Sequence, residues 1–281
     1  MTTVDAALGA ARALGVQRLD AHLLLAHVLG RSRAWLLAHG DDALPDAPAA
    51  AFHALAARRA AGEPFAYLVG EREFHGLVLA VDAAVLVPRP DTETLVEWAL
   101  ALLQGELRET PAPAVLDLGT GSGAIALALK NACPRARVWA GERSERALAV
   151  ARANAARLGL DVRFAQGDWW AALAGDPQAP AFDLVVSNPP YIADGDPHLG
   201  DLTHEPLSAL VSDRQGLGDI ERIAAGARGP LRVGGWLLFE HGREQSPAVA
   251  AILAGSGFGE VHTRADIEGR PRCTGGRLLP L

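Results

Sequence analysis

The sequence predicts an α/β protein with a doubly wound, parallel sheet, preceded by a small N-terminal helical bundle and a connecting β-hairpin. Three observations predict this fold. From residue 115 to residue 188, short apolar runs alternate with amphipathic helical stretches, as in right-handed strand–helix–strand units. Residues 4–70 carry apolar side chains at helical spacing. Between these parts, residues 71–90 alternate apolar and polar positions and end in prolines, which is typical of a hairpin.

Composition and charge set the first limits on function. A chain of 281 residues exceeds the usual size of one domain, so we expect a large domain and a smaller one. The net charge of −7 disfavours a dedicated nucleic-acid binder, although it leaves room for a local basic patch. Cys133 and Cys273 are the two cysteines, and they indicate neither a disulfide framework nor a zinc site. We expect both to be ordinary buried or half-buried cysteines.

The amino terminus gives no sign of export. It lacks the basic n-region and long apolar core of a secretory signal. No apolar run reaches the length needed to span a bilayer. We therefore expect a soluble, cytoplasmic protein without a membrane partner.

We predict a helical domain at residues 1–72, a hairpin linker at 73–90 and an α/β domain at 91–281. The helical domain shows an apolar stripe closed by Gly30, with a second, alanine-rich helix at residues 48–61. The stripe consists of Leu19, Leu23, Leu24, Leu25, Val28 and Leu29. After Pro90, the side chains of Asp91 and Thr92 can cap the first helix of the α/β domain.

A glycine-rich turn follows the first buried strand of the α/β domain, residues 115–118. Gly119, Gly121 and Gly123 alternate with Thr120 and Ser122, which allows tight turning and close approach of a ligand to bare backbone. Dinucleotide sites instead show a G-x-G-x-x-G spacing. Asp117, just before the turn, would repel a phosphate and attract an ammonium group. The turn therefore favours a cationic ligand.

The next two strands also end in residues suited to a nucleoside. Glu142 ends the second strand, where an acid can accept both ribose hydroxyls. Asp168 and Trp169 follow the third strand, and an acid beside an indole can hydrogen-bond to and stack on a purine. A surface glutamate and a buried tryptophan are the plain structural alternatives.

The fourth strand, residues 182–186, leads into the box Asn188-Pro189-Pro190-Tyr191. Two prolines supply no backbone donors and hold φ near −65°, so the loop should be stiff and extended. It presents a carboxamide oxygen and a proline carbonyl, two acceptors suited to a planar NH2 group. An adenosine with a cationic tail, next to an acceptor for NH2, is the chemistry of S-adenosylmethionine.

These residues resemble the HemK/PrmC family, the peptide-chain release factor glutamine N5-methyltransferases, over essentially the whole chain. The similar segments are residues 70–93, 117–123, 168–169, 188–191, 205–206 and 240–242. The resemblance implies a Rossmann-like class I S-adenosylmethionine-dependent methyltransferase sheet. The box alone is shared with adenine-N6 methyltransferases. The segment Arg89-Pro90-Asp91-Thr92-Glu93 and the helical domain narrow the match to this family.

The resemblance also implies roles for individual residues, and no metal. Cofactor contacts would be Gly119, Thr120, Gly121, Ser122, Gly123, Glu142, Asp168, Trp169 and Asn188. Asn188, Pro189, Pro190 and Tyr191 would bind the substrate, with Asn188, Pro189 and Tyr191 catalytic. The family usually has Asp where this chain has Glu142. The implied substrate is the glutamine of the Gly-Gly-Gln loop of bacterial class 1 release factors, contacted by the helical domain, with S-adenosylhomocysteine as product. We expect a monomer without stably bound nucleic acid.

Three other functions stay open at this point. A glutamine methyltransferase of a ribosomal protein would share the box, and an adenine-N6 methyltransferase would act on nucleic acid. A non-catalytic nucleotide- or factor-binding module would not need an intact box. Near the carboxyl terminus we expect His241 to be structural, and we expect Asp266, Arg270, Arg272 and Arg277 to be solvated or interfacial charges.

Overall fold

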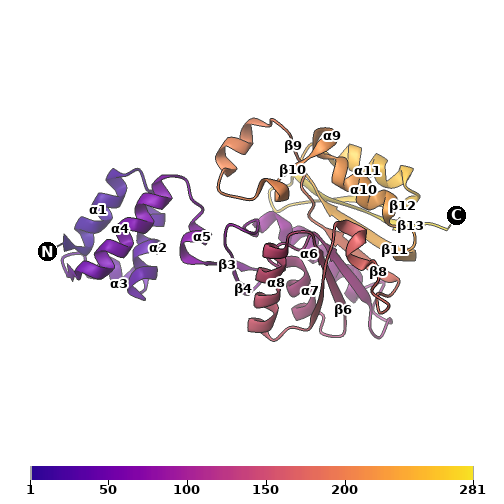
Figure 1. Ribbon diagram of the computed structural model, residues 1–281, viewed down its shortest axis with the longest axis horizontal. Coiled ribbons are helices and arrows are strands. Elements are labelled where there is room, and N and C mark those ends of the chain that lie inside the picture. The colour runs from indigo at the N-terminus through magenta and orange to yellow at the C-terminus, as the bar shows by residue number, and fades with distance from the viewer. Residues whose placement is uncertain (1, 281) are drawn as a thin grey trace. The chain divides into compact units, whose positions relative to one another are not determined.

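The computed structural model describes residues 2–280 and divides into two compact units, the first ending at Glu71 and the second starting at Arg72. The first unit is a small helical bundle (Figure 1). Its elements are β1 (Thr2–Thr3), α1 (Val4–Ala13), α2 (Arg18–Leu29), α3 (Arg33–Ala38), β2 (Ala43–Leu44), α4 (Asp46–Ala60) and α5 (Phe65–Val69). None of the helices in residues 2–280 is long and apolar enough to cross a membrane.

Local sequence signals set the bounds of these helices. The side chains of Thr3 and Ser32 accept hydrogen bonds from the first turns of α1 and α3, which is the usual N-cap interaction. Gly30 ends α2, as predicted, and the structure shows it in the left-handed conformation. The predicted stripe is only partly right, because Leu24 and Leu25 are fully buried whereas Leu19 is 50% exposed. Leu19 therefore lies outside the core of the bundle.

The predicted hairpin is present at the start of the second unit. Strands β3 (Glu71–Phe74) and β4 (Leu77–Ala80) pair in a two-stranded sheet. The turn residues His75 and Gly76 both have positive φ, 48° and 77°, which is the geometry of a two-residue hairpin turn that follows the twist of the strands.

The second unit is built on a seven-stranded sheet of order β12-β13-β11-β8-β5-β6-β7 (Figure 1). These strands are β5 (Ala114–Leu118), β6 (Arg137–Glu142), β7 (Val162–Gln166), β8 (Phe182–Ser187), β11 (Leu231–Glu240), β12 (Phe258–Ala265) and β13 (Pro271–Leu278). Strands β7, β6, β5, β8 and β11 run parallel as predicted. The sheet is mixed, however, because β13 is antiparallel to both β11 and β12. A short turn joins β12 to β13, and such a connection allows only antiparallel pairing.

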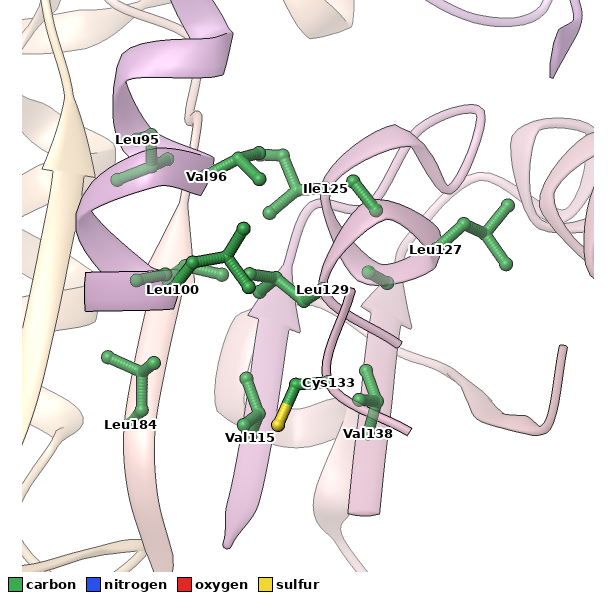
Figure 2. Packing of buried hydrophobic residues seen from close by; sticks show 14 of the residues in the cluster. Leu95, Val96, Leu100, Val115, Ile125, Leu127, Leu129, Cys133, Val138 and Leu184 are labelled. Carbon is green, nitrogen blue, oxygen red and sulfur yellow. The ribbon is translucent and has the colours of Figure 1, made fainter. Parts of the chain in front are cut away.

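Helices cover both faces of this sheet. One face packs against α6 (Glu93–Gln104) and α7 (Ala124–Ala132), with Val115, Val138 and Leu184 pointing toward them (Figure 2). The opposite face, which carries Leu116 and Val185, packs against α10 (Gly218–Gly226) and α11 (Ser246–Gly255). Successive residues of β5 thus enter two different cores, as a strand buried on both faces requires. Both cysteines are buried, as expected.

The remaining elements lie in the connections. They are η1 (Pro90–Thr92), α8 (Glu145–Leu158), η2 (Trp169–Leu173), β9 (Ile192–Ala193), η3 (Pro197–Leu202), η4 (Leu207–Ala209), β10 (Val211–Ser212) and α9 (Asp213–Gly216).

The chain order reverses between β5 and β8. From β5 the chain proceeds through β6 to β7 on one side, then returns to place β8 on the other side of β5. A crevice forms at the carboxyl ends of strands where such a reversal occurs, and ligands bind there in open α/β sheets. Leu118 pairs with Ser187, so the glycine turn and Asn188 leave the sheet side by side.

Candidate active site

A cavity of about 320 Å³ lies at this reversal, within the range of small-molecule sites. It is lined by the glycine turn, by the residues that follow β6, β7 and β8, by the segment from Ala84 to Thr92, and by residues between Pro206 and Arg222. Three of the four strand ends that the sequence analysis singled out thus reach it through Glu142, Asp168 with Trp169, and Asn188 with Pro190. The fourth, after β5, contributes Gly119 to Ser122.

The glycine turn leaves its backbone bare toward the cavity. Gly119, Gly121 and Gly123 have positive φ of 76°, 56° and 86°, a region that favours glycine. A Cβ atom on Gly119 would lie 3.1 Å from the ring of Trp169, whereas one on Gly121 would meet no atom within 4 Å. Gly119 therefore makes room for the indole, and Gly121 borders open space that a ligand can fill.

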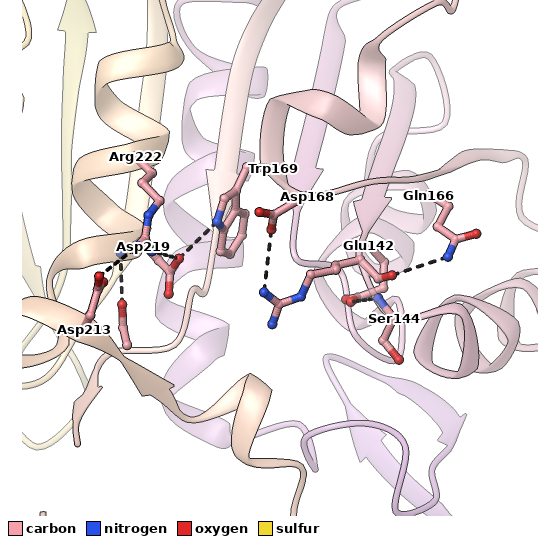
Figure 3. A network of polar contacts seen from close by, with 10 residues as sticks. Glu142, Ser144, Gln166, Asp168, Trp169, Asp213, Asp219 and Arg222 are labelled. Carbon is pink, nitrogen blue, oxygen red and sulfur yellow. Dashed lines mark hydrogen bonds and ion pairs between the residues drawn. The ribbon is translucent and has the colours of Figure 1, made fainter. Parts of the chain in front are cut away.

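Glu142 joins the glycine turn to the start of α8. Its Oε2 atom accepts a hydrogen bond from the Gly121 N–H at 3.0 Å. Its Oε1 atom accepts one from the Ser144 N–H at 2.8 Å (Figure 3). The Ser144 hydroxyl in turn caps α8. The carboxylate is half-buried and lines the cavity, and each oxygen keeps a lone pair for a further donor.

Asp117 lies beneath the turn. It is fully buried, and its Oδ2 atom accepts from the Thr120 hydroxyl at 2.6 Å and from the Ala126 N–H at 3.2 Å. Its Oδ1 atom has no hydrogen-bond partner among the described residues. Burial raises the pKa of this carboxyl to about 7. Asp117 does not line the cavity, so its charge reaches a ligand from behind the turn. A cation above would stabilise that charge.

Asp168 and Trp169 take different positions at the end of β7. Asp168 is exposed and forms a long ion pair with Arg143, 3.8 Å between Oδ1 and Nη1. Trp169 has a positive φ of 48°, and its indole N–H donates to Asp219 Oδ1 at 3.1 Å (Figure 3). The indole thus stands beside the glycine turn, facing the cavity.

An acidic cluster that the sequence did not predict lies at the far wall of the cavity. Arg222 pairs with Asp219 at 2.6 Å and with Asp213 at 2.7 Å (Figure 3). Asp219 also accepts from Trp169, so the cluster fixes the indole. The spacing of Asp219 and Arg222, three residues apart on α10, was a signal that they share a helix face. Nothing in the sequence pattern connected that face with Trp169.

The Asn188-Pro189-Pro190-Tyr191 box directly follows β8. Asn188 and Pro190 line the cavity, Pro189 is buried, and Tyr191 is half-buried outside the lining. The Asn188 Nδ2 atom donates to the Thr92 hydroxyl at 3.3 Å. Thr92 occupies the N-cap position of α6, but its side chain makes no capping hydrogen bond. The prediction that it caps this helix was therefore wrong, because its backbone is already helical and its hydroxyl faces Asn188.

A buried polar group lies behind the box. The Tyr191 hydroxyl donates to Glu240 Oε1 at 3.4 Å, and Glu240 is 1% exposed. Burial raises the pKa of Glu240 to about 7 and raises the pKa of Tyr191 above its ordinary value. The Arg272 guanidinium pairs with Asp91 at 2.8 Å, and its charge favours ionised Glu240.

Two residues near the carboxyl terminus differ from the solvated charges that we expected. The Arg272 side chain is only 12% exposed, and Asp266 is buried, accepting from the Glu268 and Arg270 N–H groups. Both are folded into the end of the β12–β13 hairpin. His241, by contrast, is structural as expected. It is fully buried and contacts the Thr274 hydroxyl at 2.8 Å through Nε2, and burial lowers its pKa.

The charges of the cavity fit a cationic nucleoside. Three arginines line it, and each is paired with an acid, Arg89 with Glu205, Arg143 with Asp168, and Arg222 with Asp213 and Asp219. Glu142 has no such cation among the described residues that line the cavity. Glu142, together with Asp117 behind the turn, therefore leaves this part of the cavity with a net negative charge. The glycine turn also exposes its backbone there. This suits the ammonium and sulfonium groups and the ribose of S-adenosylmethionine. Fold and cavity together define an S-adenosylmethionine-dependent methyltransferase.

Comparison with known proteins gives the family. Residues 5–70 match the PrmC N-terminal domain, and residues 93–207 match the methyltransferase small domain. The chain is 54% identical to a release factor glutamine methyltransferase of Bordetella pertussis, over 94% of this chain and 96% of that one. It is 46% identical to the Escherichia coli protein of that name, over 92% of each chain. The chain belongs to the release factor glutamine methyltransferase family.

Solved structures show the same fold at much lower identity. The catalytic domain of hMettl16, in complex with MAT2A 3′UTR hairpin 1, superposes with a TM-score of 0.59 at 16% identity, covering 80% of this chain and 83% of that one. A methyltransferase from Pyrococcus furiosus gives a TM-score of 0.51 at 17% identity, covering 73% and 90%. At these identities the likeness concerns the fold alone.

Proposed function

We propose that this chain transfers a methyl group from S-adenosylmethionine to the side-chain amide nitrogen, N5, of the glutamine in the Gly-Gly-Gln loop of bacterial class 1 peptide-chain release factors. The orientation of the Asn188 carboxamide carries the proposal. Its Nδ2 atom is engaged by Thr92, which leaves Oδ1 as an acceptor at the cavity, beside the glycine turn. A primary amide offers two N–H donors, so a glutamine side chain is a matching substrate.

The chemical difficulty is that an amide nitrogen is a poor nucleophile, because its lone pair is delocalised into the carbonyl group. Asn188 Oδ1 and the Pro189 carbonyl accept the two amide hydrogens of the glutamine. Holding both hydrogens on one side favours pyramidalisation of the nitrogen and directs its lone pair away from the two acceptors. Positioning of this kind supplies roughly 7–11 kcal/mol in well-oriented reactions.

The rigidity of the box supports this role. Pro189 and Pro190 fix φ and supply no N–H groups, so the loop offers acceptors without competing donors. Tyr191 is held by Glu240 on its hydroxyl, and its ring face can favour positive charge that develops on the nitrogen. No nucleophilic side chain is required for this reaction, because the amide nitrogen itself bonds to the methyl carbon as the bond from that carbon to sulfur breaks. S-adenosylhomocysteine is the leaving product, and the methylated nitrogen then loses one hydrogen as a proton to solvent.

We assign the methyl donor to the turn from Gly119 to Gly123 and to Glu142, Asp168, Trp169 and Asn188. When bound, S-adenosylmethionine supplies an electrophilic methyl group on a sulfonium. Glu142 is suited to accept ribose hydroxyls through the lone pairs that its two backbone donors leave free. Asp168 and Trp169 border the same cavity and are suited to the adenine.

We further assign recognition of the release factor to the helical domain at residues 1–72. Two observations support this. The first unit has its own core, and it matches the PrmC N-terminal domain rather than a catalytic family. The chain would act in the cytoplasm, where translation ends.

Methyl transfer to a defined panel of substrates tests the function. The full-length chain would be incubated with radiolabelled S-adenosylmethionine and one of four acceptors: purified release factor, its Gln→Ala loop variant, ribosomal protein, or DNA. We expect label on the release factor alone and none on its loop variant. Label on ribosomal protein or DNA at a comparable rate would contradict the assignment.

A further inference from the structure

The sheet fixes one end of the Asn188-Pro189-Pro190-Tyr191 box. Ser187, the last residue of β8, pairs with Leu118 and Phe239, and its hydroxyl donates to the Leu118 carbonyl at 2.7 Å. The two prolines then restrict the backbone as far as Pro190. They do not fix ψ of Pro190, so the far end of the box depends on other contacts.

Gln245, the residue before α11, holds that far end. Its Nε2 atom donates to the Tyr191 carbonyl at 3.0 Å and, over a longer distance of 3.4 Å, to the Gln215 carbonyl. Its Oε1 atom accepts from the Gly242 N–H at 2.8 Å. A carbonyl can only accept and a backbone N–H can only donate, so one orientation of the carboxamide satisfies all three partners. The main chain around Gln245 therefore sets the direction of its side chain.

A left-handed turn approaches the same Tyr191 carbonyl. Arg214, Gln215 and Gly216 have positive φ of 51°, 58° and 84°, a region that strains the two residues that carry a Cβ atom. A Cβ atom on Gly216 would lie 2.1 Å from the Tyr191 carbonyl oxygen and 2.9 Å from Gln245 Nε2. Only glycine lets the turn come this close. Backbone strain persists where surrounding contacts hold it, and it often occurs at functional sites.

We propose that Gln245 is a positioning residue, which fixes the box at Tyr191 and so keeps the two acceptors of the box aimed at the substrate amide. The proposal rests on the function proposed above, because it assumes that the box accepts from a glutamine amide. Gln245 lies outside the cavity lining. Its three hydrogen bonds go to the box, to the left-handed turn and to Gly242, and none goes to a residue assigned to the methyl donor. Gln245 therefore contributes to turnover rather than to the affinity for S-adenosylmethionine.

Two variants of Gln245 in the full-length chain test the proposal on purified release factor. Gln245→Ala should lower kcat roughly three- to tenfold, the effect of one neutral hydrogen bond. The affinity for S-adenosylmethionine, measured by calorimetric titration, should not change. KM for the release factor should stay within about twofold, because one amide is a small part of a protein interface.

Gln245→Glu separates the two ends of the side chain. An ionised carboxylate still accepts from the Gly242 N–H, but it cannot donate to the Tyr191 carbonyl. At about pH 8, well above the ordinary pKa of a glutamate carboxyl, this variant should be at least as slow as Gln245→Ala. A residue that merely supported the chain at Gly242 would give the opposite result, because Gln245→Glu would then turn over like the wild type.

Gly216→Ala displaces the same carbonyl from the other side, and Gly175→Ala is its matched control. Gly175 has a similar φ of +78° but no atom within 4 Å of an added Cβ atom, and it lies outside the cavity lining. Both variants place alanine in the left-handed region, so both should lose similar stability in urea unfolding. Only Gly216→Ala should lower kcat, by roughly threefold or more, as for Gln245→Ala. Equal kcat values for the two variants would contradict the proposal.

The proposal is also overturned if Gln245→Ala turns over like the wild type, if Gln245→Glu does so, or if the loss appears in S-adenosylmethionine affinity instead of kcat. Asn188→Ala, measured beside these variants, separates this proposal from the proposed function. If Asn188→Ala is slow but Gln245→Ala is not, the positioning proposal alone fails. If Asn188→Ala turns over like the wild type, the proposed function fails with it.

Discussion

The carboxylate of Glu142 accepts a hydrogen bond from the Gly121 N–H at 3.0 Å, which ties the end of β6 to the glycine turn after β5. One side chain thus shapes the turn and still offers acceptors to a ligand. The Glu142 side chain is long enough to reach across to Gly121 and back to Ser144.

Glu142→Ala should weaken the binding of S-adenosylmethionine by roughly ten- to a hundredfold, because hydrogen bonds to a charged group are worth about 1.5–3 kcal/mol. The fold should persist, since Glu142 is only half-buried. Calorimetric titration measures the affinity. Glu145→Ala, an exposed acid in the first turn of α8 outside the cavity, is the control. Equal affinities of the two variants would remove Glu142 from the site.

Gly119→Ala should lose cofactor affinity as well as stability. Its new methyl group would lie 3.1 Å from the Trp169 ring at a φ of +76°, so the indole has to move. Gly159→Ala is a matched control, because Gly159 has a similar φ of +66° but open space around it. Both variants should lose about 1–2 kcal/mol of stability from the left-handed backbone, measured by urea unfolding. Only Gly119→Ala should bind S-adenosylmethionine more weakly. Identical affinities would show that the indole does not border the ligand.

The raised pKa of Asp117 predicts how the free energy of unfolding depends on pH. Its pKa is about 7 in the folded chain and near 3.8 in a model compound, so the folded state holds a proton that the unfolded state has lost. Between about pH 4 and pH 7 the free energy of unfolding contributed by this group falls as the pH rises. The total over roughly three pKa units is on the order of 4 kcal/mol.

Comparing Asp117→Asn with the wild type isolates this contribution, because Glu240 titrates in the same range and with the same sign. Urea unfolding between pH 5 and pH 8 should show the wild type losing stability relative to the variant as the pH rises. A difference between the two proteins that does not change with pH would contradict a raised pKa for Asp117.

Exposed leucines on the first unit are candidates for contact with the release factor. Leu14, Leu19 and Leu37 are 52%, 50% and 59% exposed, so replacing them should not disturb the core. Leu37→Asp should raise KM for release factor at least about fivefold, the loss of one apolar interface contact, with kcat unchanged. Steady-state kinetics with varied release factor measures both constants. If Leu14→Asp, Leu19→Asp and Leu37→Asp all leave KM unchanged, these side chains are not the contact surface.

The sequence predicted the parts of this site that lie at strand ends. Glu142, Trp169 and Asn188 follow buried strands, and parallel strands bring their carboxyl ends to one edge of the sheet. The hairpin and the end of α2 at Gly30 were also predicted, because they depend on local turn chemistry.

Contacts between segments far apart in the chain could not be predicted from the sequence. Thr92 at the end of η1 contacts Asn188, which follows β8, and Asp219 contacts Trp169 from α10. The helical spacing of Leu19 predicted that its side chain is buried. Spacing alone does not show whether another element packs against that face, and Leu19 is 50% exposed. The same limit hid the burial of Arg272, which follows from the antiparallel return of β13.

In the proposed mechanism the Asn188 carboxamide is the acceptor that holds the glutamine amide. Turnover of Asn188→Ala on purified release factor, with the transferred methyl group located on the loop glutamine by mass spectrometry, tests it most directly. Removing one prearranged hydrogen-bonding group should lower kcat on the order of 10²–10³-fold, while the chain remains folded. Turnover within a factor of about two of the wild type, far less than the loss expected from such a group, would contradict the account.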